Sequence, residues 1–144
     1  MKDLIAATID PSFPLVSNLS NVAAILGRMP NINWAGFYLY DEANSRLYLG
    51  PFWGEPACIL IPLGRGVCGT AAQRRETIVV PNVDQFPGHI ACSSASRSEI
   101  VVPILRDGEL LGVIDVDAPV LDRFGEEDAR LLEEVATIVA KVWP

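Results

Sequence analysis

Hydrophobic residues recur at helical spacing in two parts of the chain, one early and one late. In residues 13–29 an apolar residue stands at every third or fourth position, Pro14 suits the first turn of a helix, and Gly27 or Pro30 ends it. A second stripe runs through residues 131–142, after an acidic start at residues 125–128 that suits the positive end of a helix. The pattern predicts two amphipathic helices, each with one face turned to a core.

Between these helices the pattern changes to short apolar runs separated by turn residues, which is typical of strands. An Asp107-Gly108 pair between two such runs predicts a tight hairpin. The predicted strands cover residues 34–40, 46–49, 58–62, 77–80, 99–105 and 110–117. This order indicates an α+β fold, in which an antiparallel sheet carries the N- and C-terminal helices on one face.

A glycine-rich stretch at residues 64–70 leads into a short predicted helix at residues 71–75. The stretch lacks the Gly-Lys-Ser/Thr ending of a phosphate-binding P-loop, and it does not match a dinucleotide fingerprint. We therefore predict no nucleotide site there.

The chain has 144 residues, half of them hydrophobic, and a formal net charge of −7. This length and composition predict a single domain over residues 1–144. The acidic balance and the lack of a basic cluster argue against nucleic acid as a partner. The apolar runs are too short for a membrane span, and the first residues do not form a signal peptide, so we expect a cytoplasmic protein without a membrane partner.

Three cysteines and one histidine are candidate reactive groups. The spacing of Cys58, Cys68 and Cys92 does not match the paired ligands of a zinc site, so we predict no metal. Buried, inert thiols are the ordinary alternative to reactive ones. Cys92 lies in residues 87–99, a stretch without periodicity that we interpret as a structured loop, and we expect it to be a redox nucleophile. His89 in the same loop is expected to bind backbone rather than to activate the thiol.

Strand alternation puts Asp115 and Asp117 on one face of a predicted strand, while Ile114 and Val116 point to the other. Two carboxylates in apolar surroundings are costly unless they are paired, solvated or bound to a ligand. An outward polar edge and a ligand-facing pair are both compatible with this pattern.

Several segments of the chain resemble a GAF domain. The motifs shared with many small-molecule sensors lie at residues 66–72, 78–83, 98–103, 112–117 and 124–128. More specific are Asn-Trp-Ala-Gly-Phe-Tyr-Leu at 33–39, Leu-Gly-Pro-Phe at 49–52 and Gly-His-Ile-Ala-Cys-Ser at 88–93, together with cysteines at 58, 68 and 92. This set resembles the free methionine-(R)-sulfoxide reductases, which are stand-alone GAF enzymes, over nearly the whole chain.

The resemblance implies a GAF-like fold, with about six antiparallel strands and with active-site loops on the face away from the terminal helices. It implies reduction of free L-methionine (R)-sulfoxide to L-methionine, with Cys92 as the nucleophile. Cys58 and Cys68 match the resolving and recycling cysteines; their order stays open, with Cys58 favoured as the direct resolver. Substrate-site carboxylates and an aromatic wall are implied at Glu99, Asp115, Asp117, Trp34 and Tyr38. A homodimer through the terminal helices is also implied.

Such a reaction needs a thiolate, an acid near the sulfoxide oxygen, and a second thiol that condenses with the enzyme sulfenic acid. Clustered carboxyls cannot all ionise cheaply, so we expect one of Glu99, Asp115 and Asp117 to keep a proton near neutrality. We expect Glu99 and Asp117 to take part in catalysis, while the remaining charge binds the substrate ammonium. Thioredoxin or another dithiol would reduce the final disulfide, and no metal or organic cofactor is expected.

Two other interpretations compete with an enzyme. One is a non-catalytic GAF module that senses a small molecule or oxidation, and the other is a structural module with buried cysteines. Three cysteines together with three carboxylates favour the reductase, because neither alternative needs that combination.

Overall fold

A computed structural model describes residues 1–90 and 95–144 of the chain. Six strands form one sheet in the order β3-β2-β1-β6-β5-β4, and every pairing among the described residues is antiparallel. The strands are β1 (Trp34–Asp41), β2 (Arg46–Gly54), β3 (Leu60–Pro62), β4 (Ile78–Val80), β5 (Ser98–Arg106) and β6 (Glu109–Ala118). The six-stranded α+β architecture predicted from the sequence is therefore confirmed.

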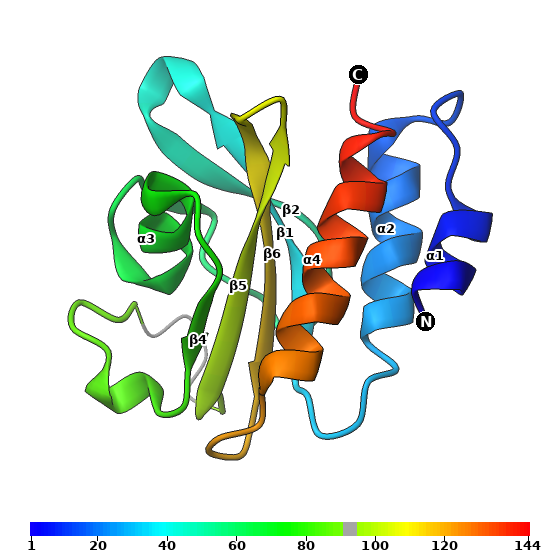
Figure 1. Ribbon diagram of the computed structural model, residues 1–144. Coiled ribbons are helices and arrows are strands. Elements are labelled where there is room, and N and C mark those ends of the chain that lie inside the picture. The colour runs from blue at the N-terminus through cyan, green and yellow to red at the C-terminus, as the bar shows by residue number, and fades with distance from the viewer. Residues whose placement is uncertain (91–94) are drawn as a thin grey trace.

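Helices cover both faces of this sheet, but unequally (Figure 1). The helices α1 (Lys2–Thr8), α2 (Leu15–Leu26) and α4 (Glu126–Ala140) lie together on one face, as expected for the terminal helices. The opposite face carries the shorter helix α3 (Gly66–Arg74). Two 3₁₀ turns, η1 (Glu42–Asn44) and η2 (Val83–Gln85), complete the elements. None of the described helices has the length and apolar character needed to cross a membrane.

The alternation of strand side chains divides the interior into two cores. Ile114 and Val116 of β6 are fully buried in the larger core beneath α1, α2 and α4. Val113 points the other way, into a smaller core with α3 residues such as Ala71. The larger core supplies most of the buried apolar surface, so we assign it the main share of the stability. The carboxyl groups of Glu99 and Asp115 are also buried on the side of the smaller core.

A bulge in β6 controls which residues face each core. The hairpin turn at Asp107-Gly108, with φ of 53° and 80°, pairs Arg106 with Glu109. The pairing then shifts by one residue, because Leu105 pairs with Leu110 but Ile104 pairs with Gly112, which leaves Leu111 as the extra residue. Without that shift, a count back from the turn would set Glu99 opposite Val116. The observed partner of Glu99 is Asp117.

The structure corrects several element boundaries. The first predicted helix begins at Leu15, after its N-cap Pro14, and ends at Leu26 before its C-cap Gly27, the earlier of the two ends predicted from the sequence. Helix α1 was not predicted from the sequence. It is short and buries only Ile5, so it has no repeated apolar pattern that would indicate a helix. The strand expected at residues 58–62 begins at Leu60, so Cys58 precedes it.

The glycine-rich stretch at residues 64–70, predicted to precede a helix over residues 71–75, is itself mostly helical. Helix α3 begins at Gly66, so Cys68 lies on a helix and not on a loop. A Cβ on Gly69 would come within 2.5 Å of the Pro62 carbonyl oxygen, so glycine is required for the helix to pack against β3. Close packing, with Ala71 and Ala72 buried, outweighs the weak helix propensity of glycine.

We predict that Gly112→Ala destabilises the fold and disturbs the bulge. The new Cβ would lie 2.4 Å from the Tyr38 carbonyl oxygen, which belongs to the backbone and cannot rotate away. Overpacking of this kind lowers the free energy of unfolding by about 1–3 kcal/mol, measured by urea denaturation. Gly125→Ala is the matched control, because a Cβ there meets nothing within 4 Å. Equal stability of the two variants would contradict the prediction.

Candidate active site

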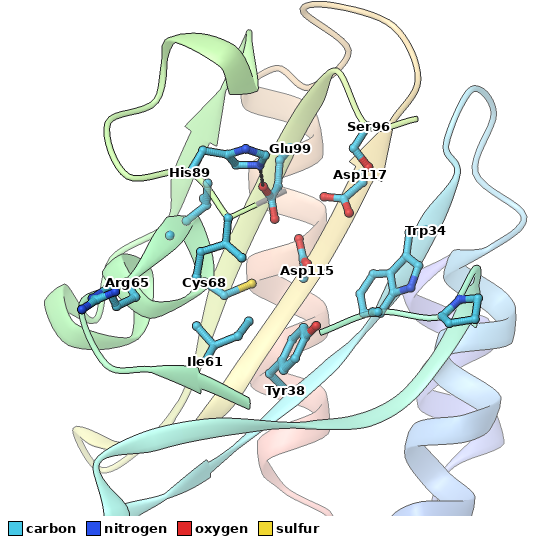
Figure 2. A pocket seen from close by; sticks show the side chains of 15 residues that line it. Trp34, Tyr38, Ile61, Arg65, Cys68, His89, Ser96, Glu99, Asp115 and Asp117 are labelled. Atoms are coloured by element: carbon cyan, nitrogen blue, oxygen red, sulfur yellow. Dashed lines mark ion pairs between the residues drawn. The ribbon is translucent and has the colours of Figure 1, made fainter. Parts of the chain in front are cut away.

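A pocket lies on the α3 face of the sheet, between that helix, strands β1, β6 and β5, and two loops. Figure 2 shows its side chains converging on one space. Its lining includes six of the eight residues predicted from the sequence: Trp34, Tyr38, Cys68, Glu99, Asp115 and Asp117. Lining residues that the sequence analysis did not select include Ile61, Arg65, Ile90 and Ser96. Cys92 lies outside the described residues.

Two rungs of the sheet form the floor of the pocket. On the first, Asp117 pairs with Trp34 of β1 and with Glu99 of β5. On the second, Asp115 pairs with Gly36 and Val101. Residues that pair across strands point to the same side, so the register itself brings the three carboxyl groups together.

These carboxyl groups, called here the carboxyl trio (Glu99, Asp115, Asp117), are removed from solvent. Glu99 is 7% exposed and Asp115 is 5% exposed, which excludes the outward polar edge considered for Asp115. Asp117 is half-buried as a residue, but its Oδ1, like the Oδ1 of Asp115, is buried and has no hydrogen-bond partner among the described residues. Buried acceptors without partners are rare in native proteins and are typical of sites that receive a ligand.

Burial is the main cause of the electrostatic state of the carboxyl trio. It raises the pKa of Glu99, Asp115 and Asp117 well above their ordinary values. Mutual repulsion adds to this effect, since the pKa of Glu99 is raised further by Asp115, that of Asp115 by Asp117, and that of Asp117 by Glu99. The trio therefore favours protonated forms and can deliver protons to a bound molecule.

Cys68 places a thiol against the carboxyl trio. It projects from α3, is 5% exposed, and is a free thiol that shares a hydrogen bond with Asp115. Burial raises the pKa of this thiol, with the negative field of Asp115 as the next cause, so Cys68 favours its neutral form. Ligand atoms of Cys68, Glu99 and Asp115 lie within 4.8 Å of one another and could hold a metal ion. The preference of all three for protons opposes such binding, and the absence of a metal stays a prediction.

Two aromatic side chains, Trp34 and Tyr38, form one wall of the pocket. The rings of Trp34 and Tyr38 are stacked with centroids 6.0 Å apart, and Phe52 stacks on Trp34 at 5.3 Å. The Tyr38 hydroxyl donates to the Cys58 carbonyl at 2.8 Å, and Trp34 Nε1 donates to the Glu55 carbonyl at 3.0 Å. The wall therefore also fixes the backbone of the segment that carries Cys58.

Cys58 and His89 lie at the edges of this arrangement. Cys58 is half-buried and disulfide-bonded. His89 Nε2 lies 3.8 Å from Glu99 Oε1, although the sequence analysis assigned this histidine to backbone binding. Burial lowers the pKa of His89, which favours the neutral imidazole beside a protonated Glu99. Both residues therefore contact side chains that line the pocket: Cys58 contacts Tyr38, and His89 contacts Glu99.

Comparison with known proteins identifies the fold and its relatives. The GAF domain model matches residues 14–143. The free methionine-R-sulfoxide reductase of Escherichia coli is 45% identical over 128 residues, which cover 88% of this chain and 76% of that protein.

Solved structures agree with this relationship. The structure of fRMsr of Staphylococcus aureus in its reduced form has a TM-score of 0.92 at 48% identity, covering 98% of this chain and 91% of that one. The free methionine-R-sulfoxide reductase from Neisseria meningitidis in complex with its substrate has a TM-score of 0.90 at 47% identity, covering 98% and 82%. The chain therefore belongs to the free methionine-(R)-sulfoxide reductases, a family of GAF-domain oxidoreductases.

Proposed function

We propose that this protein reduces free L-methionine (R)-sulfoxide to L-methionine with Cys92 as the nucleophile. The observation that carries the proposal is a carboxyl trio whose pKa values are raised by burial, beside an aromatic wall, in a chain 45% identical to a named reductase. The wall suits the methyl thioether end of the substrate, and the carboxyl groups suit its polar sulfoxide and ammonium. Roles of individual residues follow from their positions.

The first step transfers oxygen from substrate to enzyme. The Cys92 thiolate attacks the sulfoxide sulfur while a carboxyl group protonates the sulfoxide oxygen, and methionine leaves as a Cys92 sulfenic acid forms. Glu99 is our choice for the proton donor, because it is the more deeply buried of the two catalytic candidates, Glu99 and Asp117. The cysteine is oxidised and the sulfoxide is reduced by two electrons.

The later steps return Cys92 to its thiol form through a disulfide. A resolving thiol attacks the sulfenic acid, which releases water and forms a disulfide. Cys58 is the better candidate for this step. It is disulfide-bonded, so it can form the kind of bond that this step requires. The Cys68 thiol, by contrast, resists ionisation because burial raises its pKa. Cys68 then serves as the recycling thiol through exchange with that disulfide. An external dithiol such as thioredoxin accepts the oxidising equivalents, so the reaction requires neither a metal nor an organic cofactor.

Binding of the free amino acid depends on the charge left in the trio. The ammonium of the substrate places a positive charge in the pocket, and a nearby carboxyl group can then ionise at lower cost. We assign this role to Asp117, whose buried Oδ1 is open to a new donor. Asp115 supports both functions, since it interacts with the Cys68 thiol and with the other two carboxyl groups.

The cysteine roles predict distinct kinetic defects. Cys92→Ser should form no methionine from free methionine-(R)-sulfoxide, measured by chromatography, because the attacking sulfur is absent. Cys58→Ser should keep turnover with dithiothreitol, which reduces the sulfenic acid directly, but should lose turnover with thioredoxin. Wild-type protein that binds the sulfoxide without reducing it would support a sensor and overturn the enzyme. Full activity of Cys92→Ser would show that the nucleophile is assigned wrongly.

The proton donor is tested by Glu99→Gln. This change keeps size and hydrogen bonding but removes the transferable proton, so kcat should fall by about 100-fold, in the range for a lost general acid. KM should change little, because the shape of the pocket is kept. Glu109→Gln at the exposed start of β6 is the matched control and should leave kcat unchanged. An unchanged kcat in Glu99→Gln would remove Glu99 from the mechanism.

The buried carboxyl groups also predict a pH dependence of stability. Folding raises the pKa of Asp115 above its ordinary value of 3.8. Well below pH 3.8 the carboxyl group is protonated in both the folded and the unfolded state, so it does not reduce stability. As the pH rises above 3.8, the unfolded state releases the proton more readily, and the free energy of unfolding falls. Asp115→Asn should therefore be more stable than wild type near pH 8, with a smaller gain near pH 5, by urea denaturation. Asp107→Asn in the exposed turn should show no such difference. A wild-type protein that becomes less stable on going from pH 8 to pH 5 would contradict this assignment.

A further inference from the structure

A short chain of polar groups from outside the carboxyl trio reaches Asp117. Asn33 Nδ2 donates to Ser96 Oγ at 3.1 Å, and Ser96 and Asp117 line the pocket next to each other. An amide nitrogen can only donate, so Ser96 Oγ accepts from Asn33 and keeps its own proton for Asp117. Figure 2 shows Ser96 beside Asp117 at one end of the pocket.

The backbone holds both ends of this chain in register with β6. From the β1 side, the Asn33 N–H donates to the Asp117 carbonyl at 3.0 Å. From the β5 side, the Arg97 N–H donates to the Ala118 carbonyl at 2.7 Å. Since β6 lies between β1 and β5, the Asn33–Ser96 bond links the two neighbours of β6 at the end where Asp117 projects.

The three carboxyl groups therefore have different neighbours. Glu99 faces the imidazole of His89, and Asp115 meets the thiol of Cys68. Asp117 is the member of the trio that receives a hydroxyl donor already held by another residue. A fixed donor favours the ionised form of a carboxyl group, and this one lowers the pKa of Asp117 against the larger effect of burial.

We propose that Ser96, oriented by Asn33, is a positioning residue that selects Asp117 as the charged member of the trio and so sets the preference for a free α-ammonium. This inference rests on the proposed function, because it concerns how the same pocket chooses its substrate. When the ammonium arrives, it meets an Asp117 carboxyl group that already has the Ser96 hydroxyl beside it and an unpartnered Oδ1. The two carboxyl groups without that donor remain available to hold protons.

The test compares free methionine-(R)-sulfoxide with its N-acetyl derivative, which has no ammonium. In Ser96→Ala, kcat/KM for the free amino acid should fall about tenfold, mainly through KM, which is the size expected for a lost hydrogen bond to a charged group. For the N-acetyl derivative it should change less than about twofold. If the N-acetyl derivative reacts too slowly, the dissociation constants of L-methionine and N-acetyl-L-methionine are compared instead, in wild type and in Ser96→Ala. Ser96→Thr keeps the hydroxyl and should restore the preference.

Two controls separate positioning from a structural role. The Ser98 hydroxyl is buried but donates to the Val120 carbonyl at 2.7 Å, so Ser98→Ala should affect both substrates equally. Asn33→Ala should reproduce the loss of preference, because it frees the Ser96 hydroxyl to rotate. Equal losses for both substrates in Ser96→Ala, or no loss, would overturn the inference while the reductase assignment stands. Failure of wild-type protein to reduce either substrate would instead overturn the proposed function.

Discussion

A one-residue bulge at Leu111 determines the composition of the candidate active site. The side chains of a strand alternate between the two faces of the sheet. A register shift of one residue therefore changes which side chains of the two paired strands lie on the same face. The bulge brings Glu99 opposite Asp117, where an unbulged hairpin would have set it opposite Val116 in the helix-covered core. Three carboxyl groups meet in one pocket because of that extra residue. Every proposed role of the trio depends on this register.

The burial of three acids needs compensation elsewhere in the molecule. Desolvation raises the pKa of all three and so favours their protonated forms, which cost less to bury than charged ones. On the other side of the sheet, Ile114 and Val116 lie in a continuous apolar core under three helices. The sheet therefore separates a face that stabilises the fold from a face that holds the reactive groups.

Helix α3 covers part of the reactive face and packs close to the sheet. Gly69 allows its backbone to approach Pro62, and the small side chains of Ala71 and Ala72 are buried beneath it. This close approach carries the Cys68 thiol to Asp115. The same contact explains why α3 begins five residues earlier than predicted: Gly69 has a weak helix propensity, but it permits this close packing.

The sequence by itself determined the α+β class, the two hairpins, the terminal helices and the common face of Asp115 and Asp117, because these depend on local periodicity and turn chemistry. It also indicated the family through motifs around Trp34 and the three cysteines. Only the tertiary structure decided that Glu99 pairs with Asp117, that His89 faces Glu99, and that Ser96 joins Asn33 to the pocket. Those contacts join residues distant in the chain, and they depend on a bulge and on close backbone packing that no local pattern encodes.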